Sequence, residues 1–221
     1  HVTIKNTKID GYSQGVLLQL SANDNIITQN NITSCGTSIF IDKSSNRNTV
    51  VDNYIAYDGA GILIWETSSD NIITGNIVTL NRVGGIGLWK GAADNTVAKN
   101  VVTKNNGGGI GCAYGESNRN NITENEVSSN TGTGISFYYS SIDNNIVGNH
   151  VTFNGVNGID LSSGSNHNVI SGNNITSNTV SAVKLGESSN CTITGNIMAK
   201  SEWGLVLQAS SNNNTIIGNN V

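Results

Sequence analysis

Aromatic residues with the chemistry to bind sugars recur at a regular spacing in the middle of the chain. Trp65, Trp89, Tyr114, Tyr138 and Tyr139 follow one another at steps of 24 or 25 residues, with the last two adjacent. They make up five of the twelve aromatic residues in the sequence (three Trp, six Tyr and three Phe). Flat aromatic faces suit stacking on the apolar faces of sugar rings. If the fold brings these residues to one corner, they form a candidate carbohydrate-binding surface.

Charged residues accompany the aromatic ones. Asp42, Glu66 and Lys90 could hydrogen-bond sugar hydroxyls beside the rings. Lys43, Glu66 and Lys90 alternate in sign at the same spacing, a pattern more typical of a surface charge ladder than of a binding site. A second interpretation of the aromatic corner also stands, in which the rings shield a sheet edge or pack under a neighbouring chain.

Catalytic chemistry has little support in the sequence. A glycoside hydrolase needs two carboxylates at a defined separation. A lyase needs a base and a group that neutralises the sugar carboxylate. Asp160 and Lys184 lie one repeat apart, and we interpret them as a surface ion pair. We assign no catalytic residue and lean against an enzyme, keeping a polysaccharide lyase, glycosidase or epimerase as the alternative.

Metal and cofactor ligands are scarce. The histidines are scattered, at His1, His150 and His167. The three cysteines cannot all pair within one chain, and they fit no zinc motif. We expect no metal site and no cofactor, and we interpret Cys112 and Cys191 as structural.

A repeated phrase sets the positions of all these residues. Relatives of DNIITGN occur along the whole chain, with steps of 23 to 25 residues between their final asparagines. Those asparagines are Asn30, Asn53, Asn76, Asn100, Asn125, Asn149, Asn173, Asn196 and Asn219, and we predict that Asn6 begins the same series. A weaker column consists of Asn81, Asn105, Asn130, Asn154 and Asn178. Stacked asparagines bond to their copies in neighbouring repeats, so both columns are predicted to be structural ladders at corners.

Apolar residues recur at fixed offsets from each asparagine, three before it and two after it. About half a repeat later comes a further apolar pair with the strand spacing of two, as in Ile62 and Ile64. Stacked short strands of this kind wrap around a narrow apolar interior. We therefore predict an all-β, single-stranded parallel β-helix of about nine coils of 23–25 residues, forming one domain over residues 1–221.

Composition excludes several partners. The chain has no proline, 12% charged residues and a net charge of −4. Mild acidity argues against nucleic acid, and no apolar run is long enough to predict membrane insertion. The sequence shows no signal peptide and begins at His1, which indicates a removed leader or a fragment of a longer chain.

The unit N-x-I-x-x-N-x-I followed by G-I-x-L resembles the repeat of the pectate-lyase-like superfamily. It is most similar to the carbohydrate-binding and sugar-hydrolase repeat domains, a group that includes a periplasmic copper-processing protein and archaeal and bacterial surface proteins. This resemblance implies a right-handed coil and an extracellular, cell-surface or periplasmic location. Copper handling is not expected to transfer, because the chain has one Met and three scattered His residues.

Five Asn-x-Ser/Thr sequons are candidate glycosylation sites: Asn31, Asn121, Asn174, Asn190 and Asn213.

Three functions remain open from the sequence. The first is a non-catalytic surface or secreted repeat domain that binds polysaccharide or surface glycan, or acts as a spacer. The second is a polysaccharide-active enzyme. The third is a subunit that associates end to end or laterally into a surface layer or filament, because Val221 falls at a core position with no strand after it.

Overall fold

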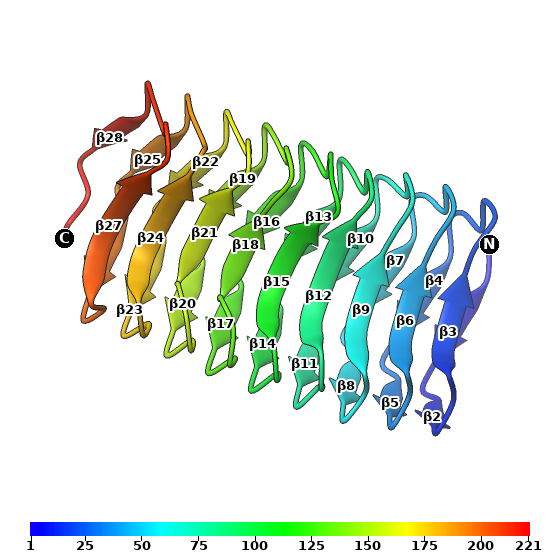
Figure 1. The fold of residues 1–221 in the computed structure, drawn as a ribbon. Coiled ribbons are helices and arrows are strands. Elements are labelled where there is room, and N and C mark those ends of the chain that lie inside the picture. The colour runs from blue at the N-terminus through cyan, green and yellow to red at the C-terminus, as the bar shows by residue number, and fades with distance from the viewer.

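The computed structural model describes residues 1–221 as a right-handed parallel β-helix (Figure 1). Each coil contributes one strand to each of three parallel sheets, which we name sheets A, B and C. The strands of one sheet come from successive coils, and the two termini lie at opposite ends of the rod. The predicted fold class, with about nine coils, is therefore confirmed. The molecule contains no α-helix, and hence no helix able to cross a membrane.

The three sheets differ in size and in strand length. Sheet A contains β1 (Thr3–Lys5), β4 (Ile26–Thr28), β7 (Thr49–Val51), β10 (Ile72–Thr74), β13 (Thr96–Ala98), β16 (Asn121–Thr123), β19 (Asn145–Val147), β22 (Val169–Ser171), β25 (Thr192–Thr194) and β28 (Thr215–Ile217). Sheet B contains β2 (Lys8–Asp10), β5 (Asn31–Thr33), β8 (Tyr54–Ala56), β11 (Ile77–Thr79), β14 (Val101–Thr103), β17 (Glu126–Ser128), β20 (His150–Thr152), β23 (Asn174–Thr176) and β26 (Ile197–Ala199). Sheet C contains β3 (Gln14–Leu18), β6 (Thr37–Ile41), β9 (Ala60–Ile64), β12 (Gly84–Trp89), β15 (Gly108–Ala113), β18 (Ile135–Phe137), β21 (Ile159–Ser162), β24 (Ser181–Gly186) and β27 (Trp203–Gln208).

The interior is built from the predicted apolar columns. Each three-residue strand of sheets A and B points only its central side chain inward, whereas the longer strands of sheet C supply two. These side chains form one continuous core cluster of 36 buried residues. In the middle coils they are fully buried, for example Ile73, Val78, Ile62 and Ile64. Burial of this kind drives the stacking of coils and fixes the register between them.

Asparagine ladders close the corners between the sheets. Asn100 is typical, because its Oδ1 accepts hydrogen bonds from the backbone N–H and the side-chain amide of Asn76, at 3.0 and 2.9 Å. The weaker column is also a ladder, as the amide of Asn81 shows by donating to Asn105 Oδ1 at 3.0 Å. A third ladder joins Asn25, Asn48, Asn71, Asn95, Asn120, Asn144 and Asn168, and Cys191 takes the next place in it.

One detail of the predicted ladder was wrong. Asn6 does not begin the series, because Lys5 is paired with Thr28 and the residue aligned with Asn30 is therefore Thr7. The backbone N–H of Thr7 donates to Asn30 Oδ1 at 3.0 Å. At each corner the residue with left-handed backbone is the one before the ladder asparagine, such as Lys99 with φ 56°. This arrangement leaves the asparagine free to point inward.

Candidate functional site

The outer face of sheet C carries three columns of side chains that point away from the core. One column begins each strand and includes Ala60, Gly84 and Gly108. The second lies at mid-strand and reads Leu63, Gly87, Gly111, Ser136, Asp160 and Lys184 from β9 to β24. The third follows the last inward residue and contains Trp65, Trp89, Ala113 and Tyr138. In the middle coils the second column changes from leucine to glycine and the third from tryptophan to alanine, while the first contains only alanine and glycine.

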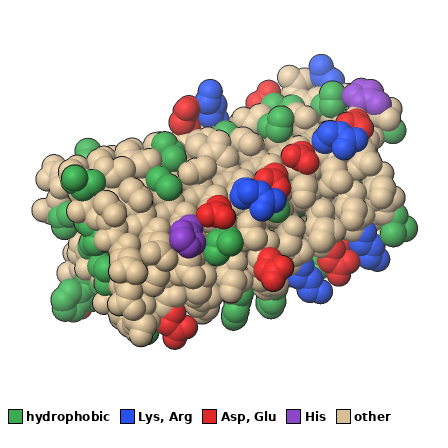
Figure 2. All heavy atoms as spheres, turned by 90° about the horizontal axis from the view of Figure 1, so that it is seen from above, with side chains coloured by type: hydrophobic (Ala, Val, Ile, Leu, Met, Phe, Trp, Pro, Cys, Tyr) green, Lys and Arg blue, Asp and Glu red, His purple; other side chains and the backbone are tan.

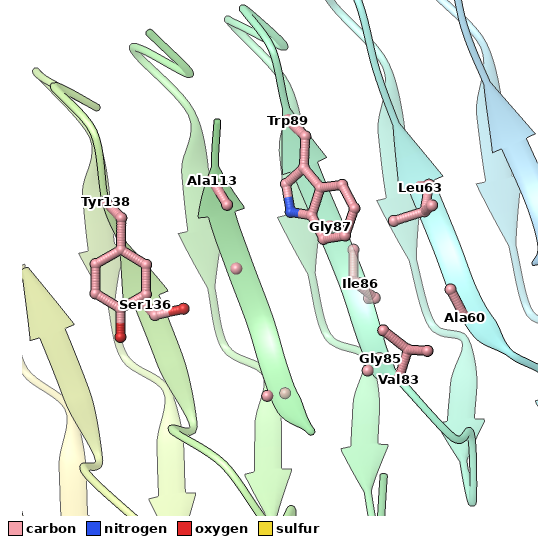
Figure 3. Close-up of a pocket in the computed structure, with 14 residues that line it drawn as sticks. Ala60, Leu63, Val83, Gly85, Ile86, Gly87, Trp89, Ala113, Ser136 and Tyr138 are labelled. Atoms are coloured by element: carbon pink, nitrogen blue, oxygen red, sulfur yellow. The ribbon is translucent and has the colours of Figure 1, made fainter. Parts of the chain in front are cut away.

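These small residues form the floor of a groove of about 150 Å³ (Figure 3). Glycines of β12 and β15 expose the backbone along the floor, with Ala113 beside them. Leu63 and Trp89 stand on one side, and Ser136 and Tyr138 on the other. A Cβ atom added to Gly87 would lie 2.7 Å from Leu63 Cδ2 and 3.0 Å from Trp89 Nε1. The indole N–H is thus placed at the floor of the groove, where it can donate a hydrogen bond to a ligand.

The five predicted aromatic residues lie together, as the sequence indicated. The rings of Trp65 and Trp89 meet edge to face with centroids 5.2 Å apart, and Trp89 meets Tyr114 at 5.3 Å. Tyr114 and Tyr139 are nearly parallel, with centroids 6.4 Å apart and an interplanar angle of 15°. Tyr138 and Tyr139 also touch edge to face at 6.4 Å. Contacts of this kind hold each ring in place without a ligand.

The cluster divides into two parts that point to different surfaces. Trp89 and Tyr138 line the groove. Tyr114 and Tyr139 come from the turns after sheet C and are more than half exposed, at 62% and 56%. Trp65 is partly buried between Phe40 and Trp89, with ring centroids at 6.2 and 5.2 Å. The candidate site therefore consists of a groove and an aromatic rim above it.

The predicted charged partners take other roles. Lys90 Nζ lies 3.6 Å from Glu66 Oε1 and 5.0 Å from the centroid of the Trp65 ring. Lys90 and Glu66 therefore form an ion pair with each other, as expected for the charge ladder that their alternating signs favoured. Asp42 is buried, and its Oδ1 has no hydrogen-bond partner in the protein. Its burial beneath the surface argues against the expected contact with a sugar hydroxyl.

Asp160 and Lys184 form the expected pair, but it is not a surface pair. Lys184 Nζ lies 3.5 Å from Asp160 Oδ2, and the Asp160 side chain is only 5% exposed. The carboxylate also accepts hydrogen bonds from Asn157 Nδ2 at 2.9 Å and from Ser162 Oγ at 2.5 Å. Tyr138 Oη donates to it at 3.4 Å. Burial, together with the Asp160 charge, raises the pKa of Tyr138 to about 12, so this phenol stays protonated at neutral pH.

A second hollow lies further along the same face, near the C-terminal end. It has a volume of about 480 Å³ and is lined by Val156, Asn157, Val180, Ser181, Lys184, Trp203, Val206 and Gln208. Neither hollow was predicted from the sequence. Gly87 and Gly111 occupy equivalent positions in the repeat, but a missing side chain marks a groove only when its neighbours are large.

Charged side chains also form a ridge over the turns that join sheet C to sheet A. Figure 2 shows acidic and basic groups following one another along it. The strongest pairs are Arg47 with Asp24 at 2.8 Å and Arg119 with Asp94 at 2.6 Å, each joining successive coils. Exposed pairs of this kind contribute little to stability, and they lie outside the groove.

The five sequons occupy outward positions of different exposure. Asn31, Asn190 and Asn213 are exposed, whereas Asn121 and Asn174 are partly buried. The Oδ1 atom of Asn174 is itself buried without a partner. Asn31, Asn190 and Asn213 are therefore the candidate glycosylation sites that are accessible at the surface.

Fold and groove together define the class of the molecule: a right-handed parallel β-helix with a glycine-floored groove on one sheet. The family described as "right handed beta helix region" matches residues 1–151, and the family described as "periplasmic copper-binding protein (NosD)" matches residues 101–221. The chain belongs to the right-handed β-helix family, and its second half overlaps the NosD family. A search of curated protein sequences gave no significant match.

Several solved structures share the fold. A double mutant of the periplasmic alginate epimerase AlgG has a TM-score of 0.81 and 18% identity, covering 89% of this chain and 50% of its own. The A-module of the mannuronan C-5 epimerase AlgE6 from Azotobacter vinelandii has a TM-score of 0.82 and 15% identity, covering 98% and 64%. DFA-IIIase from Arthrobacter chlorophenolicus A6, in complex with GF2, has a TM-score of 0.70 and 15% identity, covering 97% and 63%. The chain thus spans about half to two thirds of these proteins.

The side chains of this chain do not fit the copper binding that the NosD description names. No three His, Cys, Asp or Glu side chains cluster as metal ligands anywhere in the molecule. Met198 and Cys112 are buried in the core, and burial raises the pKa of the Cys112 thiol well above its ordinary value. A protonated, inaccessible thiol is a poor ligand for a soft metal.

Proposed function

We propose that this β-helix is a carbohydrate-binding protein of the cell surface or periplasm, and that the groove on sheet C holds its glycan. The observation that carries the proposal is the glycine-floored groove between Trp89 and Tyr138. A flat floor admits a ring close to the backbone, and the aromatic walls offer apolar faces. The indole N–H and the hydroxyl groups of Ser136 and Tyr138 supply a few oriented polar contacts.

The position of the groove supports a chain-like ligand. The sheet repeats along the rod at about 4.8 Å per coil, and the groove spans strands from β9 to β18. The second hollow continues along the same face toward β27. An extended polysaccharide lying along the rod would therefore meet one strand after another.

The family relatives support the same class of partner. The structural neighbours include two enzymes of alginate or mannuronan and one solved with GF2. AlgG and NosD are described as periplasmic. The enzymes support a polysaccharide partner for this chain, and the two periplasmic descriptions support a periplasmic or extracellular location.

Modification of the bound polysaccharide is a second candidate function, favoured by the network of Tyr138, Asp160 and Lys184. This network lies between the two hollows, where a protonated phenol could act as an acid and an ammonium could neutralise a sugar carboxylate. The Asp160 carboxylate already accepts four hydrogen bonds. No free base faces the groove among its lining residues, so binding without turnover is the better supported function.

A polysaccharide array tests the proposal. We expect the intact protein to bind at least one polymer. Trp89→Ala should lose that binding, because it removes the aromatic ring on one side of the groove. Gly111→Val is expected to lose it as well, because the new side chain fills the floor. Tyr54→Ala, which changes an exposed aromatic residue on sheet B, is the matched control and is expected to bind normally.

Product analysis in the same experiment separates binding from catalysis. Released or epimerised oligosaccharides that disappear in Tyr138→Phe would establish the enzyme instead. Binding that survives both groove variants would reject the groove as the site.

A further inference from the structure

We infer that the groove selects uncharged sugar units and discriminates against uronates. This inference rests on the proposed carbohydrate-binding function and adds the chemical class of the ligand. It is drawn from the charges that line and surround the groove.

No charged side chain lines the groove. Its fourteen lining residues are glycines, aliphatic residues, one tryptophan, one serine and one tyrosine. A sugar carboxylate that enters such a site exchanges water for apolar and neutral groups. Without a cation or several donors to replace that water, the transfer is unfavourable.

Two of the cations near the site, Lys184 and Lys90, are already paired. Lys184 is held by Asp160 at 3.5 Å, and its side chain is only 27% exposed. Lys90 is held between Glu66 and the face of Trp65, on the rim rather than in the groove. Binding a uronate through either ammonium would first break an existing ion pair.

Carboxylates stand close to the groove instead. Asp160 contacts Tyr138 Oη, so its charge lies directly behind one wall. Asp42 precedes Trp65 by one coil and keeps a buried oxygen without a partner. Lys184 compensates the charge of Asp160, so the pair offers a uronate no unpaired cation, and the net charge of −4 disfavours an anionic polymer.

One cation remains to be considered, because Arg82 precedes the lining residue Val83. Its side chain is exposed and forms no ion pair, and it is not among the lining residues. Arg82→Ala is therefore expected to leave both affinity and selectivity unchanged.

Matched polymers test the inference. Polygalacturonate, polymannuronate and polyglucuronate are each compared with their carboxyl-reduced product, which keeps the linkages and replaces each carboxylate by a hydroxymethyl group. Binding is measured by calorimetry or by retention on the immobilised polymers. We expect at least one reduced polymer to bind, with its parent at least tenfold weaker, and Gly111→Val to abolish the binding.

The charge dependence is then reversed by design. Ala113→Lys places a cation on the floor between Trp89 and Tyr138, at a partly exposed outward position. We expect this variant to bind the parent polyuronate more tightly than the wild type does. The difference in affinity between the polyuronate and its carboxyl-reduced product should therefore become smaller.

The possible results separate this inference from the proposed function. A parent polyuronate that binds as tightly as its reduced form, and is lost in Gly111→Val, would overturn the selectivity and keep the groove. Loss of polyuronate binding in Arg82→Ala would likewise overturn the selectivity. Failure of every polymer to bind, or binding unaffected by Gly111→Val, would overturn the proposed function and the selectivity together.

Discussion

Neighbouring glycines in sheet C have opposite surroundings. Gly109 faces the interior, where an added Cβ would lie 2.4 Å from Val127 Cγ1 and 2.6 Å from the backbone oxygen of Gly134. Gly111, two residues later, faces the groove, where the only close atom is the Ser136 hydroxyl at 3.2 Å. Gly109 therefore allows sheet C to pack closely against Val127 of sheet B, and Gly111 leaves space for a ligand in the groove.

Alanine at these two positions should therefore have very different effects. We expect Gly109→Ala to lower the free energy of unfolding by roughly 1–3 kcal/mol, because the methyl group overpacks the core. Gly111→Ala should change it by less than about 0.5 kcal/mol, since its backbone is ordinary strand and the new methyl faces the groove. Urea unfolding followed by circular dichroism measures both. Equal losses in the two variants would contradict the assignment of Gly111 to the outer face.

Asp58 occupies a ladder position that asparagine fills in later coils. Its carboxylate accepts hydrogen bonds from the Cys35 backbone N–H and from Ser38 Oγ, both at 2.5 Å. Burial nevertheless raises the pKa of Asp58 above its ordinary value. The folded state therefore holds this proton more tightly than the unfolded state, whose aspartate pKa is about 3.9.

Stability should depend on pH at this residue. Because the folded-state pKa of Asp58 is the higher one, its contribution is most favourable below about pH 3.9, declines as pH rises through the folded-state pKa and stays low above it. Asp58→Asn should remove this component and stabilise the protein by about 1 kcal/mol at pH 7. Thermal midpoints of both proteins from pH 3 to 8 test this. Midpoint curves that stay parallel across that range would show that the carboxylate is not responsible.

Among the elements, the corners depend most on single side chains. Asn100 Oδ1 accepts two hydrogen bonds from Asn76, and its own amide donates to Ile73 O, Ala98 O and Asn125 Oδ1. All of these groups except the partly exposed Ala98 are buried, so most have no replacement partner when the amide is removed.

Asn100→Ala should accordingly destabilise the protein by roughly 2–4 kcal/mol, because several buried donors and acceptors lose their partners. Asn121→Ala is a suitable control, since Asn121 belongs to the same coil stack but points outward and is partly exposed. We expect the control to change stability by less than about 1 kcal/mol. Chemical denaturation gives both values. A small loss in Asn100→Ala would mean that water replaces the ladder.

The elements also show why sequence alone predicted the fold better than the site. The ladder asparagines and the inward isoleucines repeat in every coil, so position in the repeat determines their environment. Asp42 and Asp160 have no equivalent aspartate at the same position in other coils. The sequence predicted that both side chains would lie at the surface. The burial of Asp160 depends on Tyr138 and Lys184, which contact its carboxylate and are not repeated from coil to coil.

The groove illustrates the same limit in another way. Gly87 and Gly111 repeat like the core residues, yet the volume above them exists because Leu63 and Tyr138 stand at either side. The sequence predicted the aromatic cluster correctly, since stacking follows from spacing. Trp89 and Tyr138 directly follow the last inward residue of their strands, and Tyr114 and Tyr139 come one position later in the repeat. The repeat distinguishes these two columns, but it did not show that only the first lines a groove.

At the scale of the whole molecule, each coil is stabilised mainly by the coils on either side. Sheet pairing runs only between successive coils, and the core is one column of side chains per strand position. Unfolding of such a rod is governed by local coil stability and by nearest-neighbour interfaces. The same substitution should therefore have an effect that depends on how many neighbours the coil has.

Ile122 and Ile216 test this dependence, because both are central residues of strands in sheet A. Ile122 is fully buried between neighbours on two sides, whereas Ile216 is 42% exposed and pairs with Ile193 alone. We expect Ile122→Ala to cost roughly 2–5 kcal/mol, as for a cavity in a close-packed core. Ile216→Ala should cost less than about 1 kcal/mol. Hydrogen exchange should show protection lost across several central coils in the first variant, and only in the last coil in the second. If both variants lost protection uniformly along the rod, the molecule would unfold as a single cooperative unit, and the groove would be as stable as its most distant coil.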